Sequence, residues 1–300
     1  MNFDLSDIPQ QEGRIAVVTG ANHGIGFETT LAMVDYSFTV VMACRSLEKA
    51  EKAKADILDK NPSANLEIMQ LDLSDLDSVR AFAEEFRNTY SCLDVLINNA
   101  GVLIYSGTKN KEGIELQFAT NHLGHFLLTN LLIDLMPDSS SSRIVALSSI
   151  AHKGAKIYFD DINCENIDDS GAAYGQSKLA NLMFADELNR RLKKSNKKIA
   201  ALAVHPGGSD SGLFDEMSKI TYYFFKILSP FILHSNAAAA KPSLFAALSP
   251  EIKGGEYLGP QGFKEFKGKV GVAKRDEYSL REDVAAKLWQ LSEEMTSDAV

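Results

Sequence analysis

The chain has 300 residues, 45% of them hydrophobic, and a formal net charge of −9 from 31 basic and 40 acidic side chains. This length and composition suffice for a large buried core. The acidic balance argues against a surface that binds nucleic acid through its charge. Cys44, Cys92 and Cys164 are far apart and form no Cys-x-x-Cys pair, so we expect neither a disulfide framework nor a cysteine metal site.

The sequence contains no membrane-spanning or targeting signal. No apolar run reaches the roughly eighteen residues that a spanning helix needs. Residues 1–14 are polar and acidic, without the apolar core of a signal peptide. We therefore expect no transmembrane segment and a cytoplasmic location.

Apolar segments typical of buried strands alternate with helical patterns along most of the chain. Strands are predicted at 14–20, 38–44, 65–73, 93–101, 143–149 and 198–207, and helices at 27–36, 46–60, 74–90, 113–135 and 174–194. Ser74 is predicted to cap the helix at 74–90. The strand segments are rich in β-branched residues without period-2 alternation, as in sheets covered on both faces. We predict an α/β fold with a doubly wound, Rossmann-type parallel sheet, as a single domain over residues 1–300.

Glycines at the first strand-to-helix turn indicate a nucleotide site. Gly20, Gly24 and Gly26, in VVTGANHGIG, follow the strand at 14–20 directly. Glycine lets the backbone pass close to a pyrophosphate, and the helix start supplies N–H groups that bind it. The position of these glycines between a strand and a helix favours a dinucleotide ligand.

Two further patterns need their surroundings to be interpreted. Tyr174 and Lys178, in YGQSK, share one face of a predicted helix, a spacing that by itself is common on solvated helices. His122 and His125 also share a helix face, but no third ligand is evident near them, and we expect no metal. His152 and His205 are interpreted as packing and loop residues.

The glycine spacing TGxxxGIG resembles that of the short-chain dehydrogenase/reductase family. Further motifs agree in order: Asp72 in LDLSD, NNAG at 98–101, a double serine at 148–149, Tyr174 with Lys178, and HPG at 205–207. The resemblance runs from about residue 14 to about residue 296. It is most marked to the branch of retinol dehydrogenases and the WW-domain oxidoreductase, through FATNHLGHFLLT, SRIVALSSIAHKG and YGQSKLANLMFADEL.

The resemblance implies a catalytic set and a cofactor site. Tyr174 would be the general acid/base, and Lys178 and the cationic nicotinamide would lower its pKa from the usual value near 10. Ser149 would bind the substrate oxygen, and Asn121 would continue a proton relay through water. The cofactor contacts implied are Gly20, Asn22, His23, Gly24, Ile25, Gly26, Arg45, Asp72, Leu73, Asn98, Ala100, Gly101, Tyr174, Lys178, Pro206, Gly207 and Ser211.

The second predicted strand favours NADPH over NADH. NAD enzymes usually place an acid at its end to bind both ribose hydroxyls. Here Arg45 stands there, no acid precedes Glu48, and His23 is a second basic residue. An arginine pairs well with a 2′-phosphate. The alternative is that Arg45 lies in solvent at the start of the helix and binds no cofactor. We expect carbonyl reduction with NADPH.

The segment 219–233, KITYYFFKILSPFIL, is the most apolar outside the predicted sheet. The resemblance implies a substrate flap at about 208–240. Tyr222, Tyr223, Phe224 and Phe225 would then form the wall of a pocket for a bulky apolar carbonyl compound or alcohol. Core packing, homo-oligomerisation and contact with a membrane surface stay open for this segment.

Two other functions compete with carbonyl reduction. The first is a catalytically weak nucleotide-sensing or scaffold protein, against which the filled catalytic positions argue. The second is a sugar-nucleotide epimerase or dehydratase, for which the roughly 90 residues after HPG are too few.

Overall fold

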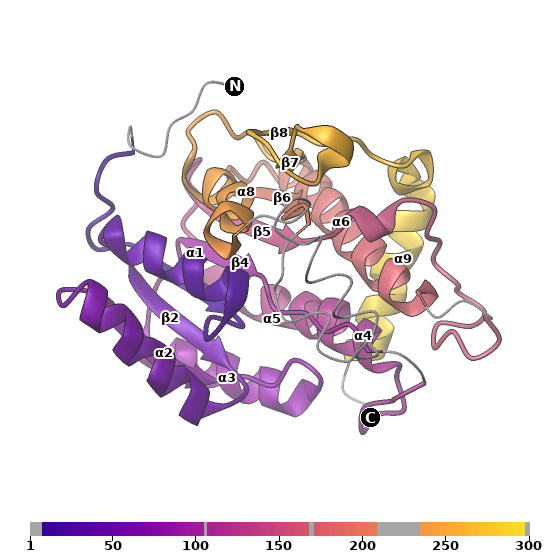
Figure 1. The fold of residues 1–300 in the computed structure, drawn as a ribbon. Helices are drawn as coiled ribbons and strands as arrows, with labels where there is room; N and C mark the ends of the chain where they lie inside the picture. Colours follow the sequence, from indigo (N-terminus) through magenta and orange to yellow (C-terminus); the bar gives the residue numbers. More distant parts are fainter. Residues whose placement is uncertain (1–7, 105–106, 168–170, 209–234, 298–300) are drawn as a thin grey trace, which may run out of the picture.

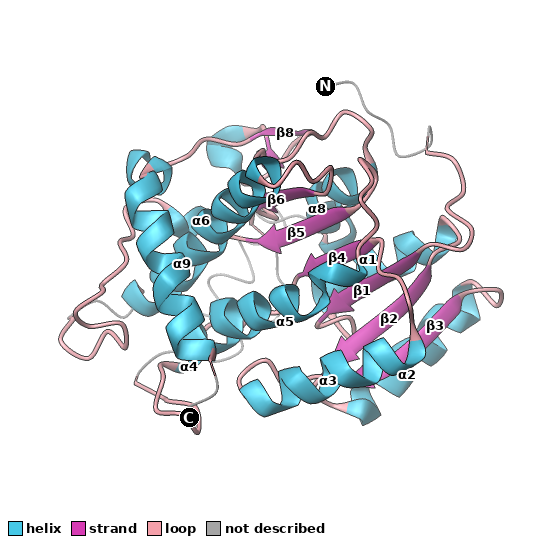
Figure 2. Ribbon diagram, turned by 180° about the vertical axis from the view of Figure 1, so that it is seen from behind, coloured by secondary structure: helices cyan, strands magenta, loops and turns pink. Residues whose placement is uncertain are grey.

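A single mixed sheet forms the centre of the computed structural model, which describes residues 8–104, 107–167, 171–208 and 235–297. Within these residues the strand order is β3-β2-β1-β4-β5-β6-β7-β8, and the sheet is parallel except for β8, which pairs antiparallel with β7 (Figure 2). The strands are β1 (Ile15–Thr19), β2 (Thr39–Cys44), β3 (Asn65–Gln70), β4 (Val95–Asn98), β5 (Arg143–Leu147), β6 (Ala200–Val204), β7 (Tyr257–Pro260) and β8 (Val270–Val272). The predicted doubly wound α/β fold is confirmed.

Helices cover both faces of the sheet (Figure 1). One face carries α1 (Gly24–Asp35), α2 (Leu47–Lys60) and α8 (Asn236–Leu248). The other carries α3 (Leu76–Thr89), α5 (Gly124–Leu132) and α6 (Ala172–Lys194), with α9 (Glu282–Thr296) packed on α6. In β1, Val17 belongs to the core on the α3 side, and Ala16 and Val18 belong to the core on the α1 side. Both faces of the strand are therefore buried, which explains its unbroken apolar sequence.

The start of α3 corrects one detail of the prediction. The Asp75 side chain accepts hydrogen bonds from the backbone N–H groups of Asp77 at 3.0 Å and Ser78 at 3.3 Å. Ser74 instead donates its hydroxyl to Asp72 at 2.6 Å. The predicted Ser74 cap is wrong because the carboxylate of the next residue reaches the first free N–H groups of the helix.

The predicted helix at 113–135 is divided in the structure. A short α4 (Leu116–Phe118) leads into a π-helical turn (Ala119–Leu123), followed by α5 and a 3₁₀ turn (Ile133–Leu135). Asn121 lies within the π-helical turn. Such turns place an extra residue in the helical path and thereby redirect a side chain.

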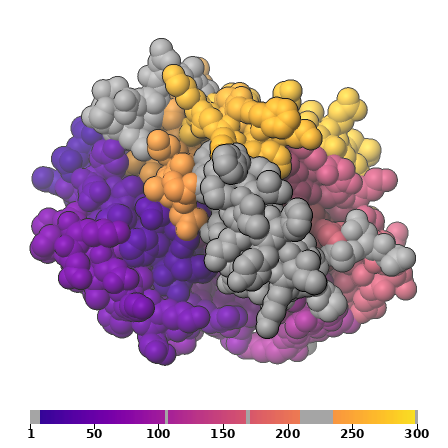
Figure 3. All heavy atoms as spheres, viewed as in Figure 1, coloured from indigo at the N-terminus to yellow at the C-terminus, as the bar shows by residue number. Residues whose placement is uncertain are grey.

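The C-terminal residues add α8, β7, β8 and α9, which were not predicted from the sequence. In Figure 3 the orange and yellow atoms of this part of the chain occupy most of the upper part of the face shown, and α9 runs down the right side of the molecule in Figure 1. The Trp289 ring of α9 stacks on Phe184 at 5.8 Å between centroids and meets Phe126 edge-on at 4.9 Å. Helix α9 thus covers the outer side of α5 and α6.

The strand order reverses between β1 and β4. From β1 the chain continues outward to β2 and β3, and it then returns to the other side of β1 to form β4. The segments that leave the carboxyl ends of β1 and β4 diverge to opposite sides, which opens a crevice between them.

Candidate active site

The glycine turn after β1 is held by close packing. Gly20 has a φ of +65°, a conformation that favours glycine. A Cβ on Gly26 would lie 2.2 Å from the Gly20 carbonyl oxygen and 2.6 Å from Asn99 Nδ2. Helix α1 begins at Gly24 without a side-chain cap, so its first N–H groups can bind a phosphate. The turn therefore fits the close approach of a dinucleotide backbone.

The end of β4 is tied to the same turn through Asn99. Its side-chain amide donates to the Thr19 carbonyl oxygen at 2.7 Å, and the Thr19 hydroxyl accepts from the Asn99 backbone N–H at 2.9 Å. Asn98, which was predicted to contact the cofactor, points instead to α5 and donates to Thr129 Oγ1 at 2.9 Å. The prediction is corrected here: Asn99, and not Asn98, borders the cleft. Successive side chains of a strand point to opposite faces, so the neighbouring residue takes the predicted place.

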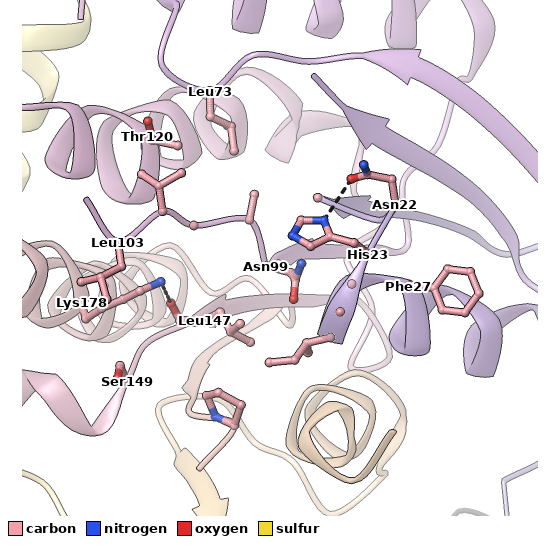
Figure 4. A pocket seen from close by; sticks show the side chains of 18 of the residues that line it. Asn22, His23, Phe27, Leu73, Asn99, Leu103, Thr120, Leu147, Ser149 and Lys178 are labelled. Carbon is pink, nitrogen blue, oxygen red and sulfur yellow. Dashed lines mark hydrogen bonds between the residues drawn. The ribbon is translucent and has the colours of Figure 1, made fainter. Parts of the chain in front are cut away.

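A cleft of about 1260 Å³ extends along the carboxyl ends of the strands. Figure 4 shows Asn22 and His23 on one side of it, with Lys178 and Ser149 on the other. The predicted cofactor residues that line it are Gly20, Asn22, His23, Gly24, Ile25, Gly26, Arg45, Asp72, Leu73, Ala100, Gly101, Tyr174, Lys178, Pro206 and Gly207. Ser211 and the predicted substrate residues Tyr222, Tyr223, Phe224 and Phe225 lie outside the described residues.

Tyr174, Lys178 and Ser149 meet in this cleft. Helix α6 carries the first two one turn apart, and Ser149 follows β5. Tyr174 and Ser149 both line the cleft, and Ser149 acts on the phenol to lower its pKa. The Lys178 ammonium lies 5.8 Å from the centre of the Tyr174 ring and donates to the Leu147 carbonyl oxygen at 3.2 Å. The structure therefore brings together the three side chains that the motifs indicated.

Burial controls the charges of this group. It raises the pKa of Tyr174 to about 12, against a smaller lowering by the hydrogen bond with Ser149. It lowers the pKa of Lys178 to about 8. The predicted lowering of the tyrosine pKa relied on the ammonium and on a cationic nicotinamide. The protein's own groups shift it the other way, because desolvation disfavours the phenolate.

Asn121 lies behind the cleft, fully buried. Its side chain accepts from the Val102 N–H at 2.8 Å and donates to the Val102 carbonyl oxygen at 3.0 Å and to Ser177 Oγ at 2.9 Å. A Cβ on Gly101 would lie 3.0 Å from Lys178 Nζ and 3.3 Å from Asn121 Oδ1. Asn121 therefore shapes the floor beside the lysine, and its part in a proton relay stays a prediction.

The two helix histidines have structural partners. His125 lies 2.8 Å from Thr19 Oγ1 through Nε2 and 2.9 Å from the Asn121 carbonyl oxygen through Nδ1. His122 Nε2 lies 2.8 Å from Ser292 Oγ of α9. Burial lowers the pKa of His125 to about 4 and that of His122 to about 3, so both rings are neutral near pH 7.

Several cleft residues were missed from the sequence. Helix α2 contributes Lys49, Lys52 and Asp56, whose spacing of three and four residues is a helical-face signal that was available. The loop between β7 and β8 contributes Phe263, Lys264, Phe266 and Lys267. No local pattern indicated that this loop reaches the cleft, because the neighbouring strands themselves were not predicted.

The fold and the cleft define a dinucleotide-binding protein with the side chains of an oxidoreductase. The short chain dehydrogenase family model matches residues 14–220, and the chain belongs to this family. It is 38% identical to mouse retinol dehydrogenase 12 over 95% of this chain and 87% of the relative. It is 37% identical to the chloroplastic short-chain dehydrogenase TIC 32 B of Brassica napus over 92% of this chain and 87% of the relative.

Solved structures share the fold. A protein from Mycobacterium paratuberculosis superposes with a TM-score of 0.81 at 35% identity, over 99% of this chain and 98% of that one. A short chain dehydrogenase from Shigella flexneri, solved with NADP, superposes with a TM-score of 0.65 at 21% identity, over 84% of this chain and 98% of that one. Across the described residues, we find no helix with the length and apolar character needed to cross a membrane.

Proposed function

We propose that the protein is a carbonyl reductase that prefers NADPH and acts on bulky apolar aldehydes or ketones. The observation that carries the proposal is the meeting of Ser149, Tyr174 and Lys178 in one cleft, with the Lys178 ammonium 5.8 Å from the centre of the Tyr174 ring. When bound, the reduced cofactor supplies a hydride to the carbonyl carbon. Ser149 donates a hydrogen bond to the carbonyl oxygen, and Tyr174 gives that oxygen its proton, so that an alcohol forms.

The protonation states of the site suit the proton transfer that reduction needs. Burial raises the pKa of Tyr174 to about 12, which keeps the phenol protonated near neutral pH, although it also makes the phenol a weaker acid. Lys178, with a pKa of about 8, is mostly cationic at pH 7. The phenolate left after donation therefore has a positive charge beside it, which stabilises it until a proton returns.

The preference for NADPH rests on the end of β2 and the start of α2. Arg45 follows the strand directly, and its guanidinium has no hydrogen-bond or ion-pair partner within the described part of the chain. Lys49 and Lys52 border the same end of the cleft. Together the three cations favour a ligand with an additional phosphate, in a protein whose net charge is −9.

The substrate class rests on apolar side chains in the lining of the cleft that contains Tyr174. Leu103 and Ile150 border the cleft from the loops after β4 and β5, and Phe263 and Phe266 border it from the β7–β8 loop. The Phe263 side chain is 83% exposed in this structure, unusual for a phenylalanine. These four side chains offer an apolar wall to a bulky carbonyl compound.

The proposal is tested with a panel of aldehydes and ketones, followed at the nicotinamide absorbance with NADPH and with NADH. We expect turnover of hydrophobic carbonyl compounds and a higher kcat/KM with NADPH. Arg45→Ala should lower the NADPH value by about ten- to hundredfold, because a charge-assisted bond contributes about 1.5–3 kcal/mol. Lys54→Ala, on the adjoining helix α2 but outside the cleft, is the matched control. Equal kcat/KM for both cofactors, or an unchanged preference in Arg45→Ala, would refute the cofactor assignment.

A further inference from the structure

His152 is completely buried three residues after Ser149, in a short 3₁₀ turn (Ile150–His152). Its Nδ1 lies 2.7 Å from the Ser149 carbonyl oxygen. Its Nε2 lies 3.4 Å from the backbone nitrogen of Asp276, which belongs to the segment after β8. The interpretation of His152 as a packing residue is thus incomplete, because both ring nitrogens have specific partners.

These partners define the tautomer of the ring. A carbonyl oxygen only accepts hydrogen bonds, so Nδ1 must carry the proton. A backbone N–H only donates, so Nε2 must be the unprotonated acceptor. Burial lowers the pKa of His152 and Lys153 acts in the same direction, while the hydrogen bond with the Ser149 backbone, Asp276 and Glu265 act against it. This environment therefore stabilises the neutral His152 ring with its proton on Nδ1.

Tyr257, the first residue of β7, completes the arrangement. Its ring meets His152 edge-on at 5.1 Å between centroids, and its hydroxyl lies 3.3 Å from the Ser149 carbonyl oxygen. The hydroxyl also lies 3.2 Å from His152 Nδ1, but that nitrogen carries a proton, so the carbonyl oxygen is the acceptor. The backbone N–H of His152 donates to the same oxygen at 3.1 Å. Three donors from two elements therefore converge on the Ser149 carbonyl.

The Ser149 hydroxyl is oriented as a consequence. Its Oγ accepts a hydrogen bond from the Ala151 N–H at 3.2 Å within the same turn. The hydroxyl proton must therefore point away from Ala151, which leaves it available on the cleft side, where Tyr174 lies. A rotation of the Ser149 peptide would move both the acceptor contact and this proton.

We propose that His152 is a positioning residue. Its Nδ1–H donates to the Ser149 carbonyl oxygen and fixes the orientation of that peptide, and its Nε2 accepts from the Asp276 N–H and so joins the turn to the segment after β8. The proposal rests on the proposed function for its effect on turnover. A second hydrogen bond joins this turn to Asp276, because the Gly154 backbone N–H donates to the Asp276 carboxylate at 3.1 Å. An ion pair between Lys153 and Glu265 joins the same turn to the β7–β8 loop.

Three substitutions separate the two contacts of the ring. His152→Asn keeps an N–H near the position of Nδ1 and loses the acceptor at Nε2. His152→Gln keeps an acceptor near Nε2 and loses the donor to Ser149, and His152→Leu loses both. We expect kcat to fall by up to about a hundredfold in His152→Leu, since a displacement near 1 Å can cost that much. His152→Asn should recover more of the loss than His152→Gln, and the dissociation constant of NADPH should be unchanged in all three.

Two further measurements distinguish positioning from general destabilisation. With C4-deuterated NADPH, the isotope effect on kcat/KM should increase in His152→Leu, because a misplaced Ser149 makes the chemical step slower. Hydrogen exchange of the backbone amides at 149–154 should become faster, a result that requires no turnover. This second measurement keeps the inference testable even if the wild-type protein reduces no carbonyl compound, which would refute the proposed function alone.

If the His152 variants fail to fold, Tyr257→Phe replaces them in these measurements, because it removes only the hydroxyl and keeps the ring packing. It should lower kcat less than His152→Leu and also accelerate exchange at 149–154. Wild-type kcat together with wild-type exchange in a folded His152→Leu protein, or in Tyr257→Phe when that variant must be used, would overturn the inference.

Discussion

Replacing Lys178 by methionine should make the protein inactive but more stable. The lysine is 4% exposed, and burial lowers its pKa from 10.5 to about 8. This shift corresponds to roughly 3 kcal/mol of unfavourable free energy for keeping the buried ammonium charged at pH 7. Methionine has a similar length and no charge, so the substitution removes this cost.

The contact that Lys178→Met loses offsets part of this cost. The Leu147 carbonyl oxygen accepts from Lys178 at 3.2 Å, but it also accepts from Asn181 Nδ2 at 3.0 Å and so keeps a partner. A hydrogen bond from a charged donor contributes about 1.5–3 kcal/mol. We therefore expect a net gain of roughly 1 kcal/mol at pH 7, and a Tm higher by roughly 2 °C.

The stability gain of Lys178→Met should decrease as the pH rises above 8. Between pH 8 and 10.5 the folded wild-type chain has released the Lys178 proton, and the unfolded chain still holds it. The free energy of unfolding of the wild type therefore rises with pH in this window, and the variant lacks this rise. The difference between the two proteins should shrink from pH 8 towards pH 10.5. The raised pKa of Tyr174 acts in the opposite sense above pH 10, but both proteins contain this group and its contribution largely cancels.

Thermal and urea unfolding of the cofactor-free proteins at pH 7 and pH 9.5 measures the effect. Lys194→Met, an exposed lysine on the same helix, is the control for the loss of one positive charge and should change little. A Lys178→Met protein that is less stable than the wild type at pH 7, or a difference that does not vary with pH, would refute the reasoning.

Two further outcomes are expected from the site. Tyr174→Phe should abolish carbonyl reduction yet leave the NADPH dissociation constant, measured by nicotinamide fluorescence, nearly unchanged; substantial residual kcat would contradict its role as proton donor. Gly26→Ala should weaken NADPH binding by more than tenfold, because its Cβ would lie 2.2 Å from the Gly20 carbonyl oxygen and displace the turn; unchanged binding in a titration would contradict the requirement for glycine.

Features encoded within a few residues could be predicted from the sequence. The glycine turn after β1 depends on local backbone geometry, and Tyr174 and Lys178 lie four apart on one helix. Arg45 follows directly from the end of an apolar strand. Each of these residues was placed correctly at the cleft because its neighbours in sequence are also its neighbours in space.

Features that depend on pairing between distant segments were missed. Strand β7 has four residues and ends on Pro260, and β8 has three, too few for a periodic signal. Pairing with neighbouring strands specifies them: β7 pairs with β6, as in the register of Ala203 with Tyr257, and β8 pairs with β7. Helix α8 contains Pro242, which breaks most helices, yet it is held by packing against α1.

The choice between Asn98 and Asn99 failed for another reason. Strand β4 is buried on both faces, so its sequence lacks the alternation that would show which residues face the cleft. A shift of one position exchanges the two faces. The strand itself was predicted, but only the structure shows which of the two asparagines faces the cleft.

The contacts of Tyr257 and Asp276 with residues 149–154 have a consequence for the synthesis of the chain. A ribosome releases the glycine turn, β5 and the Tyr174 helix long before it releases these two residues. The strands β1–β6 can assemble while the remainder is still being translated, as N-terminal parts of proteins commonly do. Ser149 acquires its full set of partners only when Tyr257 has emerged, so its carbonyl oxygen lacks one of its three donors while the segment between the two residues is being translated.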